Sequence, residues 1–323
     1  MKHIPVLLDE VIDNVKAISA GAGWFLDGTF GRGGHTRQMM AARPEFNYIG
    51  MDCDNEAVSY GKENFSEEIK SEKLKLIHDD YLYFEKHFSD LLKSKPLVGI
   101  LLDLGVSSPQ LDESRRGFSF YHDGPLDMRM NTSLPTKASD IVNQWDEKSL
   151  NDLFFNYGEV RSPFRVTNKI LDFRKSKVFS TTRELADLIE KTDGWRKKGH
   201  HPATNYFLAL RLEVNQELTK LEKILPAMVN ALAPGGRILV ITFHSLEDRI
   251  VKTEFKKLAT AGIGSLVNKK VLQPSWSDKK ENPRARSAKL RVFEKTNPNS
   301  EKNYKKSESY FKDKNKNKKR FEA

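Results

Sequence analysis

Short apolar runs alternate with helical patterns along the first hundred residues of the chain. Apolar runs that alternate with helices in this way are typical of a parallel sheet built from βαβ units. Three of the four runs end in an aspartate or lead directly into one, which a buried strand does not need. The expected strands are residues 24–26, 48–51, 74–77 and 97–102, and the first expected helices are residues 36–42 and 55–65.

The alternation stops between residues 104 and 214, where the pattern is helical, and it resumes afterwards. We therefore expect an α/β fold in which one Rossmann-like sheet is interrupted by a helical insert domain between its fourth and fifth strands. The insert shows helical patterns at 149–155, 165–173 and 182–191; a helix at 217–232, a turn at 233–236, a strand at 237–242, a helix at 246–259 and an edge strand at 287–293 follow. The expected division gives residues 1–106 and 215–294 to the sheet domain, 107–214 to the insert and 295–323 to a basic tail.

The positive charge is concentrated in that tail. The chain carries a net charge of +10, and residues 295–323 hold ten Lys or Arg against four Asp or Glu with almost no aliphatic side chains. This composition predicts disorder. Two interpretations stay open, a solubilising appendage or an arm that binds a polyanion through counterion release and base stacking.

The single cysteine, Cys53, excludes an intrachain disulfide and fits a reducing compartment. It lies between Asp52 and Asp54, so its thiol should ionise poorly and is not expected to be a nucleophile. We see no signal peptide and no apolar stretch of membrane-spanning length, and expect a cytoplasmic protein without a membrane partner. The sequence leaves the oligomeric state open.

The acidic strand ends predict a ligand site. Asp27, Asp52 and Asp103 should meet at the carboxyl edge of the sheet, where such folds bind ligands. A glycine-rich turn follows Asp27 and contains Gly31, Gly33 and Gly34, which we expect to leave room for a ligand. A turn of this kind is by itself equally consistent with tight packing of a helix on a sheet.

The neighbours of the turn favour S-adenosylmethionine over NAD as the ligand. Asp27 lies where the pyrophosphate of a dinucleotide would approach a helix N-terminus, which is unfavourable for phosphate but suits the ammonium-bearing methionine end. Asp52 is placed to accept hydrogen bonds from both ribose hydroxyls. Tyr81 follows the third strand, where its ring can stack on adenine.

Longer motifs make the chain resemble the bacterial 16S ribosomal RNA cytosine-N4 methyltransferases. The resemblance extends to about Glu294 and rests on residues 3–10, 31–35, 101–111, 116–120, 124–130, 202–218 and 243–249. It implies a class I methyltransferase with a helical insert, which uses S-adenosylmethionine to modify a cytosine amine in the decoding region of 16S rRNA in the small ribosomal subunit. The cofactor contacts that it implies are Gly33, Gly34, His35, Asp52, Tyr81, Asp103 and Gln110. The family often has phenylalanine where this chain has Tyr81, and the Lys-rich extension is not part of its pattern.

The acceptor chemistry calls for a proton acceptor, because the lone pair of the cytosine amine is delocalised into the ring. We hypothesise that Asp103, or a backbone carbonyl just after it, accepts from the amine; Asp103 could instead serve only the methionine ammonium. His244 is a second catalytic candidate, or else a hydrogen-bonded turn residue, and Ser245 is expected to cap the next helix with Asp248 at the capping-box position.

Basic and aromatic residues alternate near residue 117 in a pattern that suits an RNA lid. The alternative is a loop that covers a core and carries solvated arginines. The expected RNA contacts are Arg115, Arg116, Phe118, Phe120 and Arg129, together with Arg284 and Arg286, which cluster with Lys289 and Arg291 near the last strand.

Several other functions are disfavoured. DNA amino-methyltransferases use a Pro-Pro-aromatic motif after strand four, where this chain has Ser107-Ser108-Pro109-Gln110. A non-catalytic RNA-binding assembly factor would not need the acidic edge, and an NAD-dependent oxidoreductase is disfavoured by Asp27. We expect no metal site, since His35, His200 and His201 have neither cysteines nor a helical pair at ligand spacing.

Overall fold

The computed structural model describes residues 5–194, 201–268 and 270–296. The chain divides into two compact units, one made of Met1–Gly105 with Leu218–Ala323 and the other of Val106–Glu217. His3, His200 and the tail beyond Thr296 lie outside the described residues, so the expected disorder of the tail stays a prediction. None of the described helices is long and apolar enough to cross a lipid bilayer.

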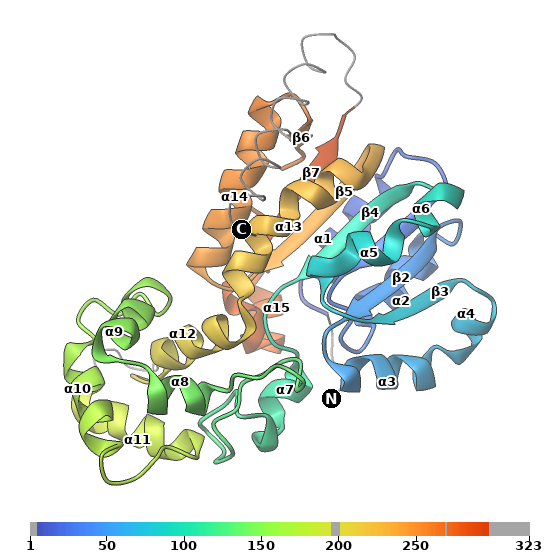
Figure 1. Cartoon of the computed structure of the whole chain (residues 1–323). Helices are drawn as coiled ribbons and strands as arrows, with labels where there is room; N and C mark the ends of the chain where they lie inside the picture. The colour runs from blue at the N-terminus through green and yellow to red at the C-terminus, as the bar shows by residue number, and fades with distance from the viewer. Residues whose placement is uncertain (1–4, 195–200, 269, 297–323) are drawn as a thin grey trace. The chain divides into compact units, whose positions relative to one another are not determined.

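A mixed sheet forms the centre of the first unit, which confirms the expected α/β, Rossmann-like fold (Figure 1). In the described residues the strand order is β3-β2-β1-β4-β5-β7-β6, and the first five strands are parallel. The strands are β1 (Trp24–Asp27), β2 (Asn47–Asp52), β3 (Leu74–His78), β4 (Leu97–Asp103), β5 (Leu232–Thr242), β6 (Gly264–Leu266) and β7 (Lys289–Lys295).

Two details of the sheet differ from expectation. The last strand, β7, is not at the edge, because the short strand β6 pairs antiparallel with its outer side. A strand of three residues such as β6 is too short to leave a hydrophobic period. The expected turn at residues 233–236 lies inside β5, where the pairing with β4 shifts register and Gly235 adopts a φ of +78°.

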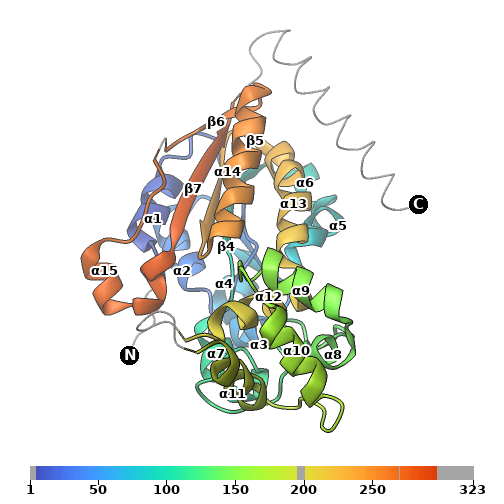
Figure 2. The ribbon, with the colours of Figure 1, turned by 90° about the vertical axis from the view of Figure 1, so that its left-hand side faces the viewer.

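Helices cover both faces of this sheet (Figure 2). Because side chains alternate along a strand, Phe25 of β1 packs on one face with α1 (Leu8–Lys16) and α2 (Gly34–Ala42). Leu26 points to the other face, which α5 (Phe84–Phe88), α13 (Glu217–Ala231) and α14 (Ser245–Thr260) cover. The remaining elements of this unit are α3 (Asn55–Asn64), α4 (Ser66–Lys70), η1 (Tyr81–Tyr83), α6 (Leu91–Ser94), α15 (Trp276–Glu281) and η3 (Pro283–Ser287).

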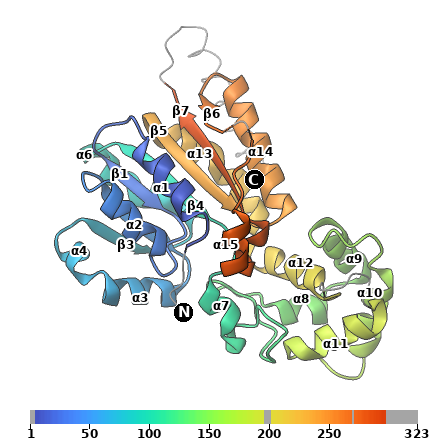
Figure 3. The same ribbon diagram turned by 180° about the vertical axis from the view of Figure 1, so that it is seen from behind.

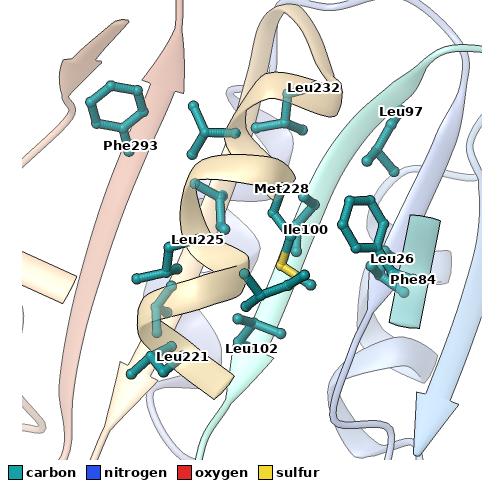
Figure 4. Packing of buried hydrophobic residues seen from close by; sticks show 14 of the residues in the cluster. Leu26, Phe84, Leu97, Ile100, Leu102, Leu221, Leu225, Met228, Leu232 and Phe293 are labelled. Atoms are coloured by element: carbon teal, nitrogen blue, oxygen red, sulfur yellow. The ribbon is translucent and has the colours of Figure 1, made fainter. Parts of the chain in front are cut away.

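The core between α13 and the sheet is aliphatic. Figure 4 shows Leu225 and Met228 of α13 beside Ile100 and Leu102 of β4. All four side chains are fully buried, and burying a side chain of this size stabilises the fold by about 1.5–3 kcal/mol. This packing fixes β4, and with it the position of Asp103 at the end of the strand.

The second unit is helical, with its own hydrophobic core. Phe154 and Tyr206 meet edge-to-face in that core, with ring centroids 4.9 Å apart. Sequence periodicity correctly predicted α9, α10 and α11 but missed α12, whose buried residues surround the helix so that no apolar stripe stands out. The elements are α7 (Ser108–Asp112), η2 (Ser114–Arg116), α8 (Ala138–Gln144), α9 (Glu147–Asn156), α10 (Phe164–Phe173), α11 (Thr182–Asp193) and α12 (Thr204–Asn215).

Candidate active site

Three aspartates end three adjacent strands at the carboxyl edge of the sheet. Asp27 ends β1, Asp52 ends β2 on one side of it, and Asp103 ends β4 on the other. The topology therefore brings together the acidic side chains that the sequence places at strand ends.

Asp27 is 2% exposed and is tied to the start of α2. Its carboxylate accepts hydrogen bonds from Thr36 Oγ1 at 2.6 Å and from Thr29 N at 3.2 Å. Burial raises the pKa of Asp27 to about 6, although these hydrogen bonds and the nearby His35 lower it. The residue therefore orders the glycine turn and also supplies a carboxyl group that can titrate near neutral pH.

Asp52 connects the end of β2 to the same turn. Its Oδ2 accepts from Gly31 N and its Oδ1 accepts from Asp54 N, both at 2.8 Å. Burial raises the pKa of Asp52 to about 7 against these two hydrogen bonds, and the negative charges of Asp54 and Asp27 raise it further. Since a carboxylate oxygen can accept more than one hydrogen bond, both oxygens retain capacity for ligand hydroxyls.

The glycines of the turn are needed for reasons that differ from the expected one. Gly33 has a φ of +69°, and a Cβ there would come within 2.5 Å of the Phe65 ring. A Cβ on Gly34 would come within 2.8 Å of Pro5. Space that was expected for a ligand at these two positions is therefore filled by protein. Of these three glycines, only Gly31 has open space beside it. Among the described atoms, the nearest neighbour of a Cβ there would be the Thr29 carbonyl oxygen, at 3.9 Å.

His35, which is buried, and Asp103, which is 26% exposed, lie side by side and carry unsatisfied polar atoms. His35 Nε2 lies 3.6 Å from Asp103 Oδ2, and His35 is 7% exposed. Among the described residues, neither ring nitrogen of His35 nor Oδ1 of Asp103 has a hydrogen-bond partner. Each such buried atom costs about 1–3 kcal/mol. Such atoms are uncommon in folded proteins and mark this edge as a candidate ligand site.

Two neighbours complete the edge. Tyr81 begins η1, and its Cβ lies 3.4 Å from the position that a Cβ on Gly28 would occupy, so the ring starts beside the glycine turn. Burial and the charge of Asp52 raise the pKa of the Cys53 thiol well above its usual value. This confirms the expectation of a poorly ionised thiol.

At the end of β5 the helix cap differs from expectation. His244, not Ser245, is the N-cap of α14, and its Nδ1 accepts from Glu247 N at 3.4 Å. Its Nε2 lies 3.1 Å from Oε1 of Glu247, a side chain that is 1% exposed. Asp248 is not part of a capping box, because it pairs with Arg291 at 2.6 Å and Lys289 at 3.1 Å. The cap therefore uses Nδ1 of His244, whereas its buried Nε2 has no hydrogen-bond partner among the described residues, so His244 stays a catalytic candidate beside Asp103.

In the second unit, several expected RNA contacts are used internally. Arg116 is 4% exposed and donates to the carbonyl oxygens of Arg129 and Met130. Arg129 forms a two-point pair with Asp127 at 2.7 and 2.8 Å. Phe118 is buried in the core of the unit. These contacts favour the alternative of a core-covering loop over an RNA lid for Arg116, Phe118 and Arg129.

Three other candidates of this unit have different surroundings. Arg115 is exposed and pairs with Glu113 at 2.6 Å. Phe120 packs against Phe207, with ring centroids 4.8 Å apart. Gln110 is 7% exposed, and its Oε1 accepts from Ser107 N in the capping box of α7. The structure therefore explains the burial of Gln110 without a cofactor, and its cofactor contact stays a prediction from the resemblance.

Near the last strand, the expected basic cluster separates into two pairs. Lys289 and Arg291 are held by Asp248, whereas Arg284 and Arg286 are exposed on η3. No group of three metal-ligating side chains occurs among the described residues.

Comparison with known proteins adds the family. The model of the MraW methylase family matches residues 1–296. The chain belongs to this family. The match includes all three aspartates of the sheet edge and ends at the last described residue, so the Lys-rich extension lies outside it.

Relatives of this MraW-family chain are similar over nearly their whole length. Proteins named ribosomal RNA small subunit methyltransferase H from Bdellovibrio bacteriovorus, Elusimicrobium minutum and Lactobacillus delbrueckii subsp. bulgaricus are 46%, 43% and 41% identical to it. Each alignment covers 91% of this chain and, in the same order, 88%, 98% and 99% of the relative. These matches confirm the resemblance and the assignment of the chain as a methyltransferase.

One exposed aromatic residue of this MraW-family chain was not singled out from the sequence. Trp276, in α15, is 77% exposed and lies in the same segment as Arg284 and Arg286. The sequence feature that could have identified it is an aromatic residue three positions before the pair Lys279-Lys280.

Proposed function

We propose that this chain is an S-adenosylmethionine-dependent enzyme that methylates the exocyclic N4 amine of a cytosine in the decoding region of 16S rRNA. The observation that carries the proposal is the set of Asp27, Asp52 and Asp103, of which Asp27 is buried and the other two are partly exposed, at one sheet edge of a MraW-family chain. The name shared by its relatives supports the small ribosomal subunit as the partner. The single cysteine supports the cytoplasm as its compartment.

The groups at the sheet edge fit this cofactor. Asp52 would accept from the ribose hydroxyls, Tyr81 would stack on adenine, and the glycine turn with Asp27 would face the methionine end. The unsatisfied ring nitrogens of His35 support the fit, because a bound ligand would supply their partners. When bound, the cofactor supplies an electrophilic methyl group on a positively charged sulfur.

Asp103 is our candidate for the group that receives the proton from the amine. The chain on both sides of its carboxylate is fixed, since Asp103 N donates to Thr29 Oγ1 at 2.6 Å and Leu104 N donates to Ile241 O at 3.0 Å. His35 lies beside Oδ2, which leaves Oδ1 for the amine. A carboxylate held in this way would accept one of the two amine protons as nitrogen forms its bond to the methyl carbon and the carbon–sulfur bond breaks, which would release S-adenosylhomocysteine. A backbone carbonyl after Asp103 is the alternative acceptor, and in that case Asp103 serves the methionine ammonium.

We further propose that the helical unit, Val106–Glu217, is the substrate-recognition domain. A groove between α10 and α11 carries four cationic side chains against two carboxylates, and one of these carboxylates, Glu184, is engaged in the capping box of α11. An excess of cations in a groove favours a phosphate backbone as its ligand. The cations are Arg165, Lys169, Lys177 and Lys191.

The proposal is tested by incubating the protein with methyl-labelled S-adenosylmethionine and either small ribosomal subunits, naked 16S rRNA or DNA. Nucleosides from the product are then separated and identified by mass spectrometry. We expect N4-methylcytidine from the subunits or the rRNA, and its much slower formation with Asp103→Asn. Label that appears only in DNA, on another base or nowhere would overturn the proposal.

A further inference from the structure

Trp276 is the most exposed large hydrophobic side chain of the described residues, at 77%. Trp276 is the first residue of α15, and η3 begins shortly after α15 ends. Exposed tryptophan is costly in water and is enriched at binding surfaces. No activity described above uses Trp276.

The segment that carries Trp276 is anchored to the first unit. A capping box between Ser275 and Asp278 fixes the start of α15. Ala285 of η3 is 2% exposed and Ala288 is 1% exposed, so η3 is held against the protein by its small side chains. The indole is therefore presented by a fixed backbone.

The same segment is positively charged. Residues 276–287 contain four cations against two carboxylates, and the carboxylate of Asp278 accepts from Ser275 N at 2.8 Å in the capping box. Lys280 Nζ lies 5.5 Å from the centroid of the Trp276 ring. Arg284 and Arg286 are exposed. An aromatic ring among exposed cations is the combination that binds single-stranded nucleic acid, through base stacking and phosphate contacts.

The sheet register sets the distance from the start of β7, which follows this segment in the chain, to Asp103 at the acidic edge. β7 begins at Lys289, directly after η3, and Lys289 pairs with Thr242 of β5. The preceding residue of β5, Ile241, pairs with Asp103 on the other side. With strands about 4.8 Å apart, Lys289 lies about 10 Å from Asp103 along the edge. Figure 3 shows α15 near the start of β7. At a rise of 3.4 Å per stacked nucleotide, this spacing corresponds to about three nucleotides.

We infer that the segment from Trp276 to Ser287 binds the single-stranded RNA that flanks the target cytosine. Trp276 stacks on an unpaired base, and Arg284 and Arg286 contact the phosphates beside it. The inference rests on the proposed function, since it deepens the assignment of RNA as the substrate. A protein partner is disfavoured because exposed cations surround the indole, whereas the core of a protein interface is depleted of charge.

The first test compares Trp276→Ala with Trp276→Phe, using a labelled single-stranded RNA fragment that spans the target cytosine. We expect the alanine variant to bind the fragment about ten- to hundredfold more weakly, since stacking contributes strongly to such complexes. The phenylalanine variant should recover most of the affinity. In methyl transfer, KM for the RNA should rise with Trp276→Ala while kcat stays within about twofold. RNA should also quench the tryptophan fluorescence of the wild-type protein more than that of Trp276→Phe.

The second test measures the salt dependence of RNA binding. Arg284→Ala and Arg286→Ala should each lower the slope of log affinity against log salt by about 1. Lys256→Ala is the matched control, because Lys256 is an exposed cation three helical turns beyond the start of α14 and should leave the slope unchanged.

The outcomes separate this inference from the proposed function. Unchanged RNA affinity and quenching in Trp276→Ala, in a protein that still methylates rRNA, would overturn the inference alone. Loss of affinity for intact subunits but not for naked RNA would also overturn it and would point to a ribosomal protein. Absence of methyl transfer by the wild-type protein would overturn the function, whatever the binding result.

Discussion

Charged side chains have opposite roles in the two units of this protein. At the sheet edge of the first unit, the ring nitrogens of His35 and Oδ1 of Asp103 are buried atoms without a hydrogen-bond partner among the described residues. In the second unit, Arg116 and Arg129 are also largely buried, but they are satisfied by backbone carbonyls and by Asp127. The first arrangement needs something outside the protein, and the second needs nothing. A charge therefore indicates a site when burial leaves it unpaired, and a structural role when burial comes with partners.

Removal of the unpaired carboxylate should give the largest effect. Asp103→Asn keeps the shape of the side chain but cannot accept a proton, and we expect kcat to fall by about 10²–10⁴-fold. Single-turnover methyl transfer at saturating cofactor measures the chemical step. Asp13→Asn, an exposed aspartate of α1, is the matched control.

A second readout separates the two roles of Asp103. If Asp103 serves only the methionine ammonium, the variant will bind the cofactor more weakly while kcat at saturation stays near that of the wild-type protein. That result would exclude Asp103 as the proton acceptor and would move the search to the carbonyl groups that follow it.

The contrast also explains what the sequence could predict. Asp27, Asp52 and Asp103 were identifiable because parallel topology brings the ends of β1, β2 and β4 to one edge whatever the details of packing. The helices α2, α3, α9, α10, α11, α13 and α14 followed from their periodicity. The others were not predicted, among them α1, α8 and α12, the last of which is buried around its circumference. Only the strand order reveals that β6, not β7, lies at the sheet edge.

The sequence could not show which cationic side chains of the loops are exposed and which are buried. Arg115 and Arg116 are neighbours with the same chemistry, yet one is exposed and the other is 4% exposed. Their difference depends on which carbonyl oxygens turn inward when residues 117–130 fold back on η2, and no local pattern encodes this. The expectation that Ser245 caps α14 was wrong for a similar reason, since the choice of His244 as the cap depends on the path of the chain after β5.

The structural role of Arg116 predicts the next largest effect. Arg116→Met keeps most of the apolar stem but leaves the carbonyl groups of Arg129 and Met130 without this donor, and should destabilise the second unit by about 1–3 kcal/mol. Arg115→Met should change stability by less than about 0.5 kcal/mol, because its pair with Glu113 is at the surface. Hydrogen exchange of the amides in α8–α12, read by mass spectrometry, localises the effect to this unit. Equal protection in the two variants would contradict the assignment.

The smallest effect tests whether the acidic edge behaves as a ligand site in solution. Asp52 and Asp27 have pKa values raised to about 7 and about 6, mainly by burial, so both carboxyl groups are largely protonated at pH 5 and ionised at pH 8. A ligand that donates hydroxyl hydrogen bonds and carries positive charge binds the ionised forms better, so its binding must release protons. We expect the affinity for S-adenosylmethionine to rise with pH and then level off above pH 8. Since a group with a pKa of about 7 is about one-tenth ionised at pH 6, Asp52 alone should weaken binding there by about tenfold.

Calorimetry in two buffers of different ionisation enthalpy measures both the affinity and the number of protons released. Asp52→Asn cannot ionise, so it should bind more weakly at pH 8 and should lose the part of the pH dependence centred near 7. The remaining dependence should then be centred near 6, at Asp27. S-adenosylhomocysteine lacks the positive charge on sulfur but keeps the ribose and the ammonium, so it should retain the dependence that comes from Asp52. An affinity that does not change with pH in the wild-type protein would mean that these carboxyl groups do not contact the ligand. The difference between the two units would then concern only how their charged side chains pack within the protein.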